Sequence, residues 1–381
     1  MKEEKREEIF VGIDIGSTTT KMAAITTMKD QILFSSYKRH HANQVESVLQ
    51  VLKEFQKKFS MKKIKVALTG SGSKPMAEAI KIPFIQEVAA NATALKKKYS
   101  FVNTAIELGG QDAKMIFFKK DSKNGEKSVS DMRMNGSCAG GTGAFIDEIA
   151  SVLKVPVEKF NQLAEKGKHV YDISGRCGVY AKTDIQPLLN QGVSKEDLAL
   201  SAFHAIAKQT IGGLAQGLEI EKPVAFEGGP LTFNPTLVQV FAQRLHLSKE
   251  EVIRPQHPEL MVAFGAAKAI PEMFPDCKEV TAEKLIHRLE EKKEELMTGS
   301  SSHTKPFFVS EEEKQAFENR HKKKKRISYE PKQGEIVYGY LGMDAGSTTT
   351  KFVILNEKEE MLDSFYAPNE GDPLLVASQA L

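Results

Sequence analysis

The fold is decided by the stretch Gly-Ile-Asp-Ile-Gly-Ser-Thr-Thr-Thr-Lys at residues 12–21, which recurs as Gly-Met-Asp-Ala-Gly-Ser-Thr-Thr-Thr-Lys at residues 342–351. Only the second and fourth letters differ. Glycine lets the backbone approach a phosphate group, and the hydroxyl and amide groups can donate hydrogen bonds to its oxygens. The aspartate can hold a hydrated magnesium ion, and the lysine neutralises charge. The stretch is typical of a polyphosphate-binding turn, so the chain begins a nucleotide-binding domain twice.

The composition is that of a globular protein with two or three domains. At 381 residues the chain exceeds what one hydrophobic core usually organises. Its 53 basic and 50 acidic residues give a formal charge of only +3, so we expect no nucleic-acid partner. No apolar run approaches the roughly 20 residues of a membrane span, and no signal peptide precedes the first predicted strand. We therefore expect a cytoplasmic protein without a membrane partner.

Strands, helices and glycine turns alternate through the first part of the chain, as an α/β domain requires. A strand hairpin is predicted around each of two phosphate-binding turns, one at residues 12–21 and the other at 107–114. Two such hairpins predict two similar lobes, about residues 9–100 and 101–275, which face each other across a cleft.

Four glycine-bearing turns follow predicted strands, at residues 12–21, 70–72, 107–114 and 227–230. A single turn of this kind says little, because tight turns use glycine for purely geometric reasons. Four in this order, with acidic residues in the first and third, are far more specific. The set resembles the ATPase superfamily of sugar kinases, actin and heat-shock chaperones. That resemblance implies a two-lobed, actin-like (ribonuclease H-like) α/β fold with ATP in the cleft between the lobes.

The same resemblance assigns roles to individual positions. Asp14 is expected to hold Mg²⁺ through a water molecule, with Glu107 and Asp112 as further catalytic carboxylates. The nucleotide is expected to lie against eleven residues, which are Gly12, Gly16, Ser17, Thr18, Thr19, Lys21, Gly109, Gly110, Gln111, Gly228 and Gly229.

Two of the three cysteines lie in glycine-rich polar turns. Cys138 lies in Asn-Gly-Ser-Cys-Ala-Gly-Gly-Thr-Gly at residues 135–143, directly before a predicted helix at 142–153, and Cys177 lies in Ser-Gly-Arg-Cys-Gly at 174–178. A thiol at a helix N-terminus is acidified by the helix dipole, which favours the thiolate that binds metal. Two cysteines supply half of the four thiolates that a 4Fe-4S cluster takes, and a cluster shared across a dimer axis completes the set. The alternative is that both are small, buried apolar residues.

The combination resembles the activators of 2-hydroxyacyl-CoA dehydratases and the ATPase subunits of benzoyl-CoA reductases, over about residues 9–275. Its most distinctive parts are the two cysteine turns. The resemblance implies a homodimer with one 4Fe-4S cluster held by Cys138 and Cys177 of each subunit. It also implies that ATP hydrolysis drives one low-potential electron, received from reduced ferredoxin or flavodoxin, to an iron–sulfur dehydratase or reductase component.

Two features depart from that family pattern. Glu107 stands where smaller activators commonly have aspartate, which keeps the charge but lengthens the side chain. The chain also continues through a charged helical or flexible linker, residues 276–335, into the second copy of the turn, as in large fused activases. We expect residues 336–381 to be the truncated start of a second ATPase domain. It would hold one hairpin that is disordered or docks opportunistically, because an isolated hairpin is marginally stable.

Two other functions stay open from the sequence. A small-molecule kinase of the same superfamily would use Asp112 or Asp184 as a general base. An ATP-gated, chaperone-like binding module would need no chemistry at the cysteines. Both leave the two cysteine turns unexplained, so the sequence favours an ATPase coupled to electron transfer.

Overall fold

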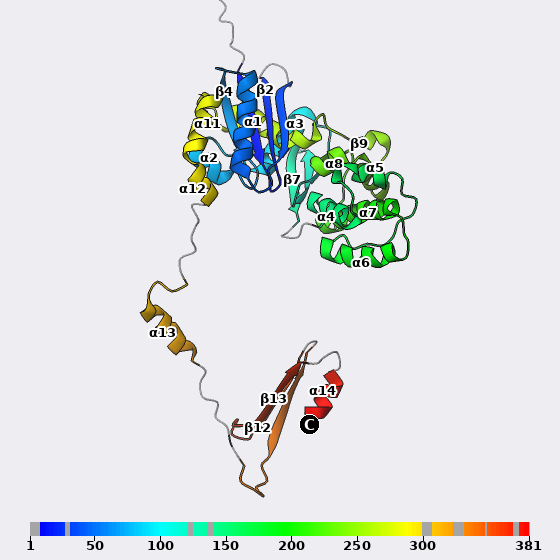
Figure 1. Cartoon of the computed structure of the whole chain (residues 1–381), viewed down its shortest axis with the longest axis vertical. Helices are drawn as coiled ribbons and strands as arrows, with labels where there is room; N and C mark the ends of the chain where they lie inside the picture. The colour runs from blue at the N-terminus through cyan, green and yellow to red at the C-terminus, as the bar shows by residue number, and fades with distance from the viewer. Residues whose placement is uncertain are drawn as a thin grey trace, which may run out of the picture. The chain divides into compact units, whose positions relative to one another are not determined.

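The computed structural model of the chain consists of two separately packed units, Met1–Ser300 and Ser301–Leu381 (Figure 1). It describes residues 8–26, 31–120, 125, 127–135, 140–298, 307–322, 329, 331–346, 349–368 and 373–380. All the site residues predicted from the sequence belong to the larger unit, which has two lobes.

The first lobe is built on a five-stranded sheet in the order β10-β4-β1-β2-β3. Its strands are β1 (Ile9–Ile15), β2 (Thr19–Thr26), β3 (Ile32–Arg39), β4 (Lys63–Thr69) and β10 (Val280–Thr281). Strand β1 runs antiparallel to β2 and parallel to β4. One face of the sheet is covered by α1 (Gln44–Lys58), α2 (Lys74–Ile80) and α11 (Ala282–Glu291), and α12 (Lys293–Thr298) follows. Apolar side chains at helical spacing, such as Val48, Leu52 and Phe55 of α1, fill this core.

The second lobe repeats this plan in a sheet of order β7-β6-β5-β8-β9. Its strands are β5 (Thr104–Leu108), β6 (Ala113–Lys120), β7 (Lys127–Met134), β8 (Val224–Glu227) and β9 (Val252–Ile253). Strand β5 is antiparallel to β6 and parallel to β8, as β1 is to β2 and β4. Its helices are α4 (Gly143–Leu153), α5 (Phe160–Ala164), α6 (Gly178–Asn190), α7 (Lys195–Ala215), α8 (Gly229–Phe233) and α9 (Pro235–Arg244). Short 3-10 turns lie at η1 (Val157–Lys159), η2 (Lys249–Glu251) and η3 (Pro258–Leu260).

Two helices, α3 (Glu87–Lys98) and α10 (Met261–Met273), form a third core that includes residues of both sheets. They cross so closely that a Cβ atom at Gly265 of α10 would lie 1.8 Å from the carbonyl oxygen of Ala90. A Cβ atom at Gly12 of β1 would likewise lie 1.9 Å from the carbonyl oxygen of Ala263. Only glycine fits at these two positions, because the nearest atoms that a Cβ would meet belong to the backbone and cannot move aside cheaply.

The packed unit extends beyond residue 275, where a linker was expected to begin. Strand β10 pairs with β4, and α11 buries Leu285, Ile286 and Leu289 against the first sheet. These apolar positions make a stripe on one face of an otherwise charged helix, which is why the segment packs. The second lobe was expected to end at residue 275, but the chain returns to the first lobe earlier, at α10, which packs against β1.

The smaller unit contains α13 (Glu311–His321) and a three-stranded antiparallel sheet of β11 (Gly339–Ala345), β12 (Thr349–Asn356) and β13 (Met361–Pro368), followed by α14 (Pro373–Ala380). A single hairpin was expected, but β13 pairs with β12 as a third strand. Phe352 and Phe365 pack across that pairing with ring centroids 5.6 Å apart. A third strand and an apolar contact give the sheet more support than a lone hairpin has.

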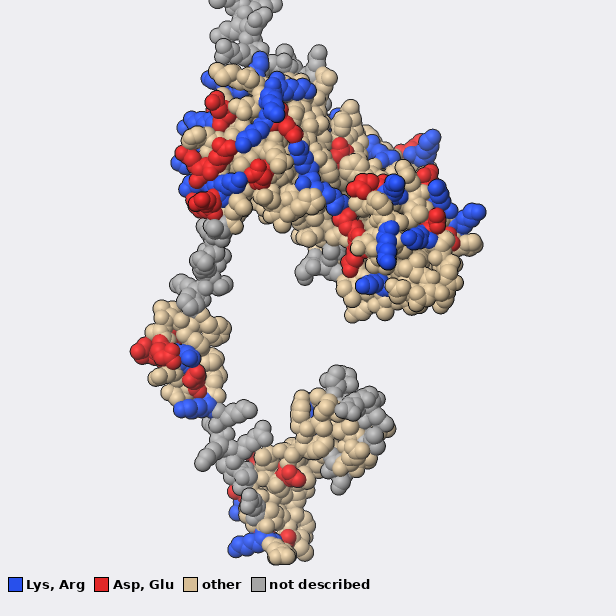
Figure 2. Space-filling view, in the orientation of Figure 1, with Lys and Arg blue, Asp and Glu red and all other residues tan. Residues whose placement is uncertain are grey.

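Charges of both signs lie side by side on the face of the larger unit that Figure 2 shows. Within the described residues, none of the helices combines the length and the hydrophobicity that crossing a bilayer requires.

Candidate functional site

The first phosphate turn is the bend between β1 and β2. The backbone N–H of Gly16 donates to the carbonyl of Thr19 at 3.0 Å and closes the bend. Residue His40, just after β3, holds the turn from the side: its N–H donates to the Thr18 carbonyl at 3.1 Å, and its Nε2 lies 3.0 Å from the Gly16 carbonyl oxygen. The predicted turn is therefore rigidly supported before any ligand arrives.

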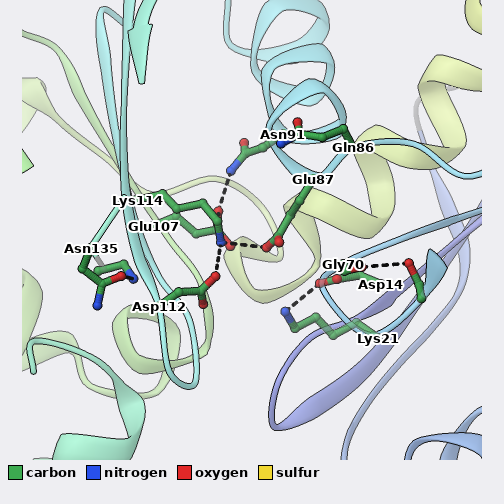
Figure 3. A network of polar contacts seen from close by, with 12 residues as sticks. Asp14, Lys21, Gly70, Gln86, Glu87, Asn91, Glu107, Asp112, Lys114 and Asn135 are labelled. Carbon is green, nitrogen blue, oxygen red and sulfur yellow. Dashed lines mark hydrogen bonds and ion pairs between the residues drawn. The ribbon is translucent and has the colours of Figure 1, made fainter. Parts of the chain in front are cut away.

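Asp14 and Lys21 face each other across the β1–β2 register and form an ion pair of 2.7 Å (Figure 3). Asp14 is fully buried, and this burial raises the pKa of its carboxyl while Lys21 opposes the rise. Burial alone would lower the pKa of Lys21, but the Asp14 and Glu107 carboxylates outweigh it and hold that pKa above its usual range. The lysine is thus a permanent positive charge at the base of the turn.

Several oxygens around this turn are buried without a hydrogen-bond partner among the described residues. They are Asp14 Oδ1, Ser17 Oγ, Thr20 Oγ1 and Thr69 Oγ1. Gly70, with φ +99°, brings its backbone so close that a Cβ atom there would lie 2.5 Å from Asp14 Oδ1. Buried oxygens normally find partners. A carboxylate oxygen and three hydroxyls that lack them are the kind of oxygen donors that a hydrated magnesium ion takes.

A second cluster of charges surrounds Lys114, which projects from β6 and is 2% exposed (Figure 3). Its Nζ lies 2.8 Å from Glu87 of α3, 2.7 Å from Asp112 and 3.8 Å from Glu107 of β5. Burial opposes the charge of Lys114, but these three carboxylates raise its pKa. Asn91 donates a further hydrogen bond of 3.1 Å to Glu107. Two of the predicted catalytic carboxylates, Glu107 and Asp112, therefore share one buried lysine.

Glu227 ends β8 directly beside Glu107, its partner in the parallel register. It is fully buried, and this burial, together with the Glu107 charge, raises the pKa of Glu227 to about 8. The carboxyl is therefore mostly protonated at neutral pH. The next residue, Gly228, has φ +89°, and a Cβ atom there would lie 2.1 Å from the Leu108 carbonyl oxygen.

The second phosphate turn is tied to helix α4. Two backbone hydrogen bonds connect them, from Gly143 N to the Gly109 carbonyl at 3.0 Å and from Ala144 N to the Gly110 carbonyl at 2.7 Å. Gly110 also touches the first phosphate turn, since a Cβ atom there would lie 2.0 Å from Thr18 Oγ1. The two turns and the start of α4 thus form one contiguous structure.

A pocket of about 370 Å³ lies between the lobes at this place. Of the predicted nucleotide-binding residues it is lined by Thr18, Thr19, Lys21, Gly109, Gly110 and Gly229. Residues that were not predicted complete the wall, among them Tyr37, Arg39, Asp147, Phe233 and Asn234. Gly12 does not line the pocket, because it is the packing site for α10. Gly16, Ser17, Gln111 and Gly228 flank the pocket in the chain without lining it.

The side chains that were missed follow a simple pattern. Lys114 is two residues beyond Asp112 in the sequence. Arg39 is two residues beyond Tyr37 on β3, where the period of two of a strand could have placed both side chains on one face. Asp184, nominated as a kinase base, instead accepts the N–H of Ser174 at 2.8 Å in the second cysteine turn. It does not line the pocket.

Cys138 lies outside the described residues, as do residues 136, 137 and 139, whereas Asn135 and the residues from Gly140 onward are described. Helix α4 begins at Gly143, which confirms the helix predicted after that turn. Cys177 is partly exposed and is the N-cap residue of α6. This helix was not predicted from the sequence. A Cβ atom at Gly140 would lie 2.0 Å from the Arg176 carbonyl oxygen, so the two cysteine turns touch. Among the described residues, no group of three or more metal-binding side chains gathers.

Known proteins share this architecture. The sequence profile described as BadF/BadG/BcrA/BcrD ATPase family matches residues 11–268. The activator of lactoyl-CoA dehydratase from Anaerotignum propionicum is 29% identical over 270 residues, which covers 68% of this chain and 95% of that protein. These matches confirm the expected family and the ATPase class.

Two solved structures resemble the chain closely. Component A of (R)-2-hydroxyglutaryl-CoA dehydratase from Acidaminococcus fermentans has a TM-score of 0.60 at 27% identity, covering 68% of this chain and 96% of that one. The activator of 2-hydroxyisocaproyl-CoA dehydratase from Clostridium difficile, solved with bound ADPNP, has a TM-score of 0.59 at 25% identity, covering 75% and 97%. The expected two-lobed ATPase fold is confirmed.

Proposed function

Because the chain belongs to the BadF/BadG/BcrA/BcrD ATPase family, we propose that it is an ATP-dependent activator that delivers a low-potential electron to a 2-hydroxyacyl-CoA dehydratase or a benzoyl-CoA reductase-like iron–sulfur enzyme. The observation that carries this proposal is the direct link between the second phosphate turn and α4, the helix that follows the Cys138 turn. A change at the nucleotide is thereby passed to the cysteine turns through hydrogen-bonded backbone.

The nucleotide site fits Mg²⁺ and ATP in its donor set. Asp14 would hold the hydrated cation, as its unpartnered buried Oδ1 supports. Lys21 and the amides of the two phosphate turns would neutralise and orient the phosphates. Magnesium would supply a positive charge between the phosphates and the carboxylates. Glu107 and Asp112, held by Lys114, would face the water that attacks the terminal phosphate.

The cysteine turns fit a shared 4Fe-4S cluster in the part that the structure describes. Cys177 is accessible at the start of a 13-residue helix, where unpaired amides favour an anionic group. Gly140 and Arg176 bring the Cys138 turn against the Cys177 turn. Two thiolates from each of two subunits would complete four ligands, so we propose a homodimer. The cluster would store the electron, which reduced ferredoxin or flavodoxin would supply.

The chain's own residues account for the need for ATP. Closing the lobes on the phosphates fixes Gly109 and Gly110, which accept hydrogen bonds from the first two amides of α4. Movement of α4 changes the exposure and the hydrogen bonding around the cysteine turns, and both set the potential of an iron–sulfur centre. ATP binding and hydrolysis would thus gate the electron rather than carry it.

Anaerobic purification tests the proposal. We expect a brown protein with about four irons per dimer, which transfers electrons to an activator-dependent dehydratase only while it hydrolyses ATP. Cys138→Ser and Cys177→Ser should each lose the iron and the electron transfer but keep the binding of ATP. Cys277→Ser, at a cysteine remote from these turns, is the matched control and should keep all three properties. A colourless wild-type protein, or a Cys138→Ser variant that keeps its iron, would show the proposal to be wrong.

A further inference from the structure

Two side chains of β3 reach across the nucleotide pocket into the second lobe. Tyr37 and Arg39 are two positions apart, so they lie on the same face of the strand. The Tyr37 ring meets the ring of Phe233 edge-on, with centroids 5.4 Å apart. The Arg39 guanidinium donates two hydrogen bonds to the carboxylate of Asp147 on α4, at 2.8 and 3.1 Å. All four side chains line the pocket.

The Arg39–Asp147 pair connects two sets of contacts around the pocket, one to each phosphate turn. Next to Arg39, His40 binds the Thr18 and Gly16 carbonyls of the first phosphate turn. On the other side, the first two amides of α4 bind the second phosphate turn, and Asp147 lies one helical turn further along. Helix α4 is therefore held by the second lobe at its start and by the first lobe at its second turn.

We propose that Arg39 and Asp147 are positioning residues that set the angle of α4 when the lobes close on nucleotide. A bidentate pair between a guanidinium and a carboxylate fixes orientation as well as distance. Its side chains are 49% and 36% exposed, so the pair adds little to the overall stability of the fold. Its place between the lobes makes it a geometric link from the phosphates to α4. That α4 then acts on the cysteine turns rests on the proposed function. That the Arg39–Asp147 pair positions α4 does not depend on it.

The competing role for Arg39 is a direct contact with the nucleotide, and the two roles predict different effects at Asp147. If Arg39 serves the phosphates, removing the Asp147 charge frees the guanidinium and leaves nucleotide binding intact or tighter. If the pair positions α4, then Arg39→Ala and Asp147→Asn weaken closure equally. The double variant is then no worse than either single variant, because both changes break one interaction.

The experiment uses the full chain with the non-hydrolysable analogue AMP-PNP and Mg²⁺. Calorimetry measures affinity, and hydrogen exchange measures the protection of α4 amides with and without the analogue. We expect each single variant and the double variant to bind about two- to fivefold more weakly, the range for exposed ion pairs. Each should also lose most of the protection that the analogue gives to α4. An Asp147→Asn protein with wild-type affinity and protection overturns the proposal.

Lys38→Ala is the matched control. Lys38 is the neighbour of Arg39 on β3, and its ion pair with Glu54 stays within the first lobe. This variant should bind AMP-PNP and protect the α4 amides as the wild type does. An equal loss of affinity and protection in Lys38→Ala would mean that any change in β3 causes the effect, which would overturn the proposal. Neither readout involves iron or electron transfer, so a failure of the proposed function leaves this result unaffected.

Discussion

At the residue scale, the cleft is marked by several buried ionisable side chains. Lys21 and Lys114 are each held by carboxylates from other elements, and burial beside Glu107 raises the pKa of Glu227 to about 8. Such groups are costly to bury unless they are paired, and they gather where a site needs fixed charge. Here they surround the place where phosphates and a cation would sit.

Glu227 gives a prediction with a definite sign. Its folded pKa of about 8 lies above that of an unfolded glutamate, near 4.5. Between these values only the unfolded state loses its proton, so the free energy of unfolding falls as pH rises, by about 1.4 kcal/mol for each pH unit. Glu227→Gln removes this term. Denaturant melts should show the variant gaining stability relative to the wild type from pH 5 to pH 8.

The control for this pH dependence is Glu165→Gln, at an exposed position of the second lobe. Its stability relative to the wild type should not change over the same interval. A Glu227→Gln protein whose relative stability is also flat from pH 5 to pH 8 would mean that Glu227 is ionised in the folded state.

At the scale of elements, β1 packs closely on α10, a helix of the core that includes residues of both sheets. A Cβ atom at Gly12 would lie 1.9 Å from the Ala263 carbonyl oxygen, which is backbone and cannot move aside cheaply. Gly342, its counterpart in the second copy, would place a Cβ atom 3.4 Å from Val353 Cγ1, an ordinary contact. A side chain at Gly12 would therefore clash with the backbone, whereas one at Gly342 would not, although the two glycines occupy the same position of the motif.

Gly12→Ala should destabilise the larger unit by about 2–3 kcal/mol or prevent its folding, because overpacking forces backbone shifts. Gly342→Ala should change stability by less than about 0.5 kcal/mol, as is usual for exposed sites. Thermal unfolding and nucleotide binding of both variants provide the check. Equal effects in the two variants would mean that β1 and α10 are not packed as described.

The elements that could be predicted from the sequence are those whose signal is local. The hairpins at both phosphate turns and α4 follow from alternating apolar residues, glycine turns and a polar helix start. Helix α6 was missed because Pro187 interrupts it and it buries few residues. The pairing of Arg39 with Asp147 and of Lys114 with Glu87 depends on which strands and helices become neighbours, and the local sequence pattern carries no record of that.

At the scale of the whole molecule, the two copies of the phosphate turn differ in their surroundings. The Asp14–Lys21 and Asp344–Lys351 pairs have similar lengths, 2.7 and 2.6 Å. The Asp14 side chain is fully buried, whereas that of Asp344 is 65% exposed. Opposite β2, strand β1 pairs with β4, whereas β11 pairs only with β12 among the described residues. In the part of the chain that the structure describes, the first copy alone lies at a cleft between two lobes.

The central claim, that the nucleotide cleft controls the cysteine turns through α4, is tested most directly by iron accessibility. Bathophenanthroline disulfonate would be added to the anaerobically purified full chain, and the rate of iron removal would be followed by absorbance with and without Mg·ATP. We expect Mg·ATP to raise that rate at least about threefold, because moving α4 would expose the cluster that we propose the cysteine turns hold. An iron-loaded protein whose rate is the same with and without Mg·ATP would contradict the claim.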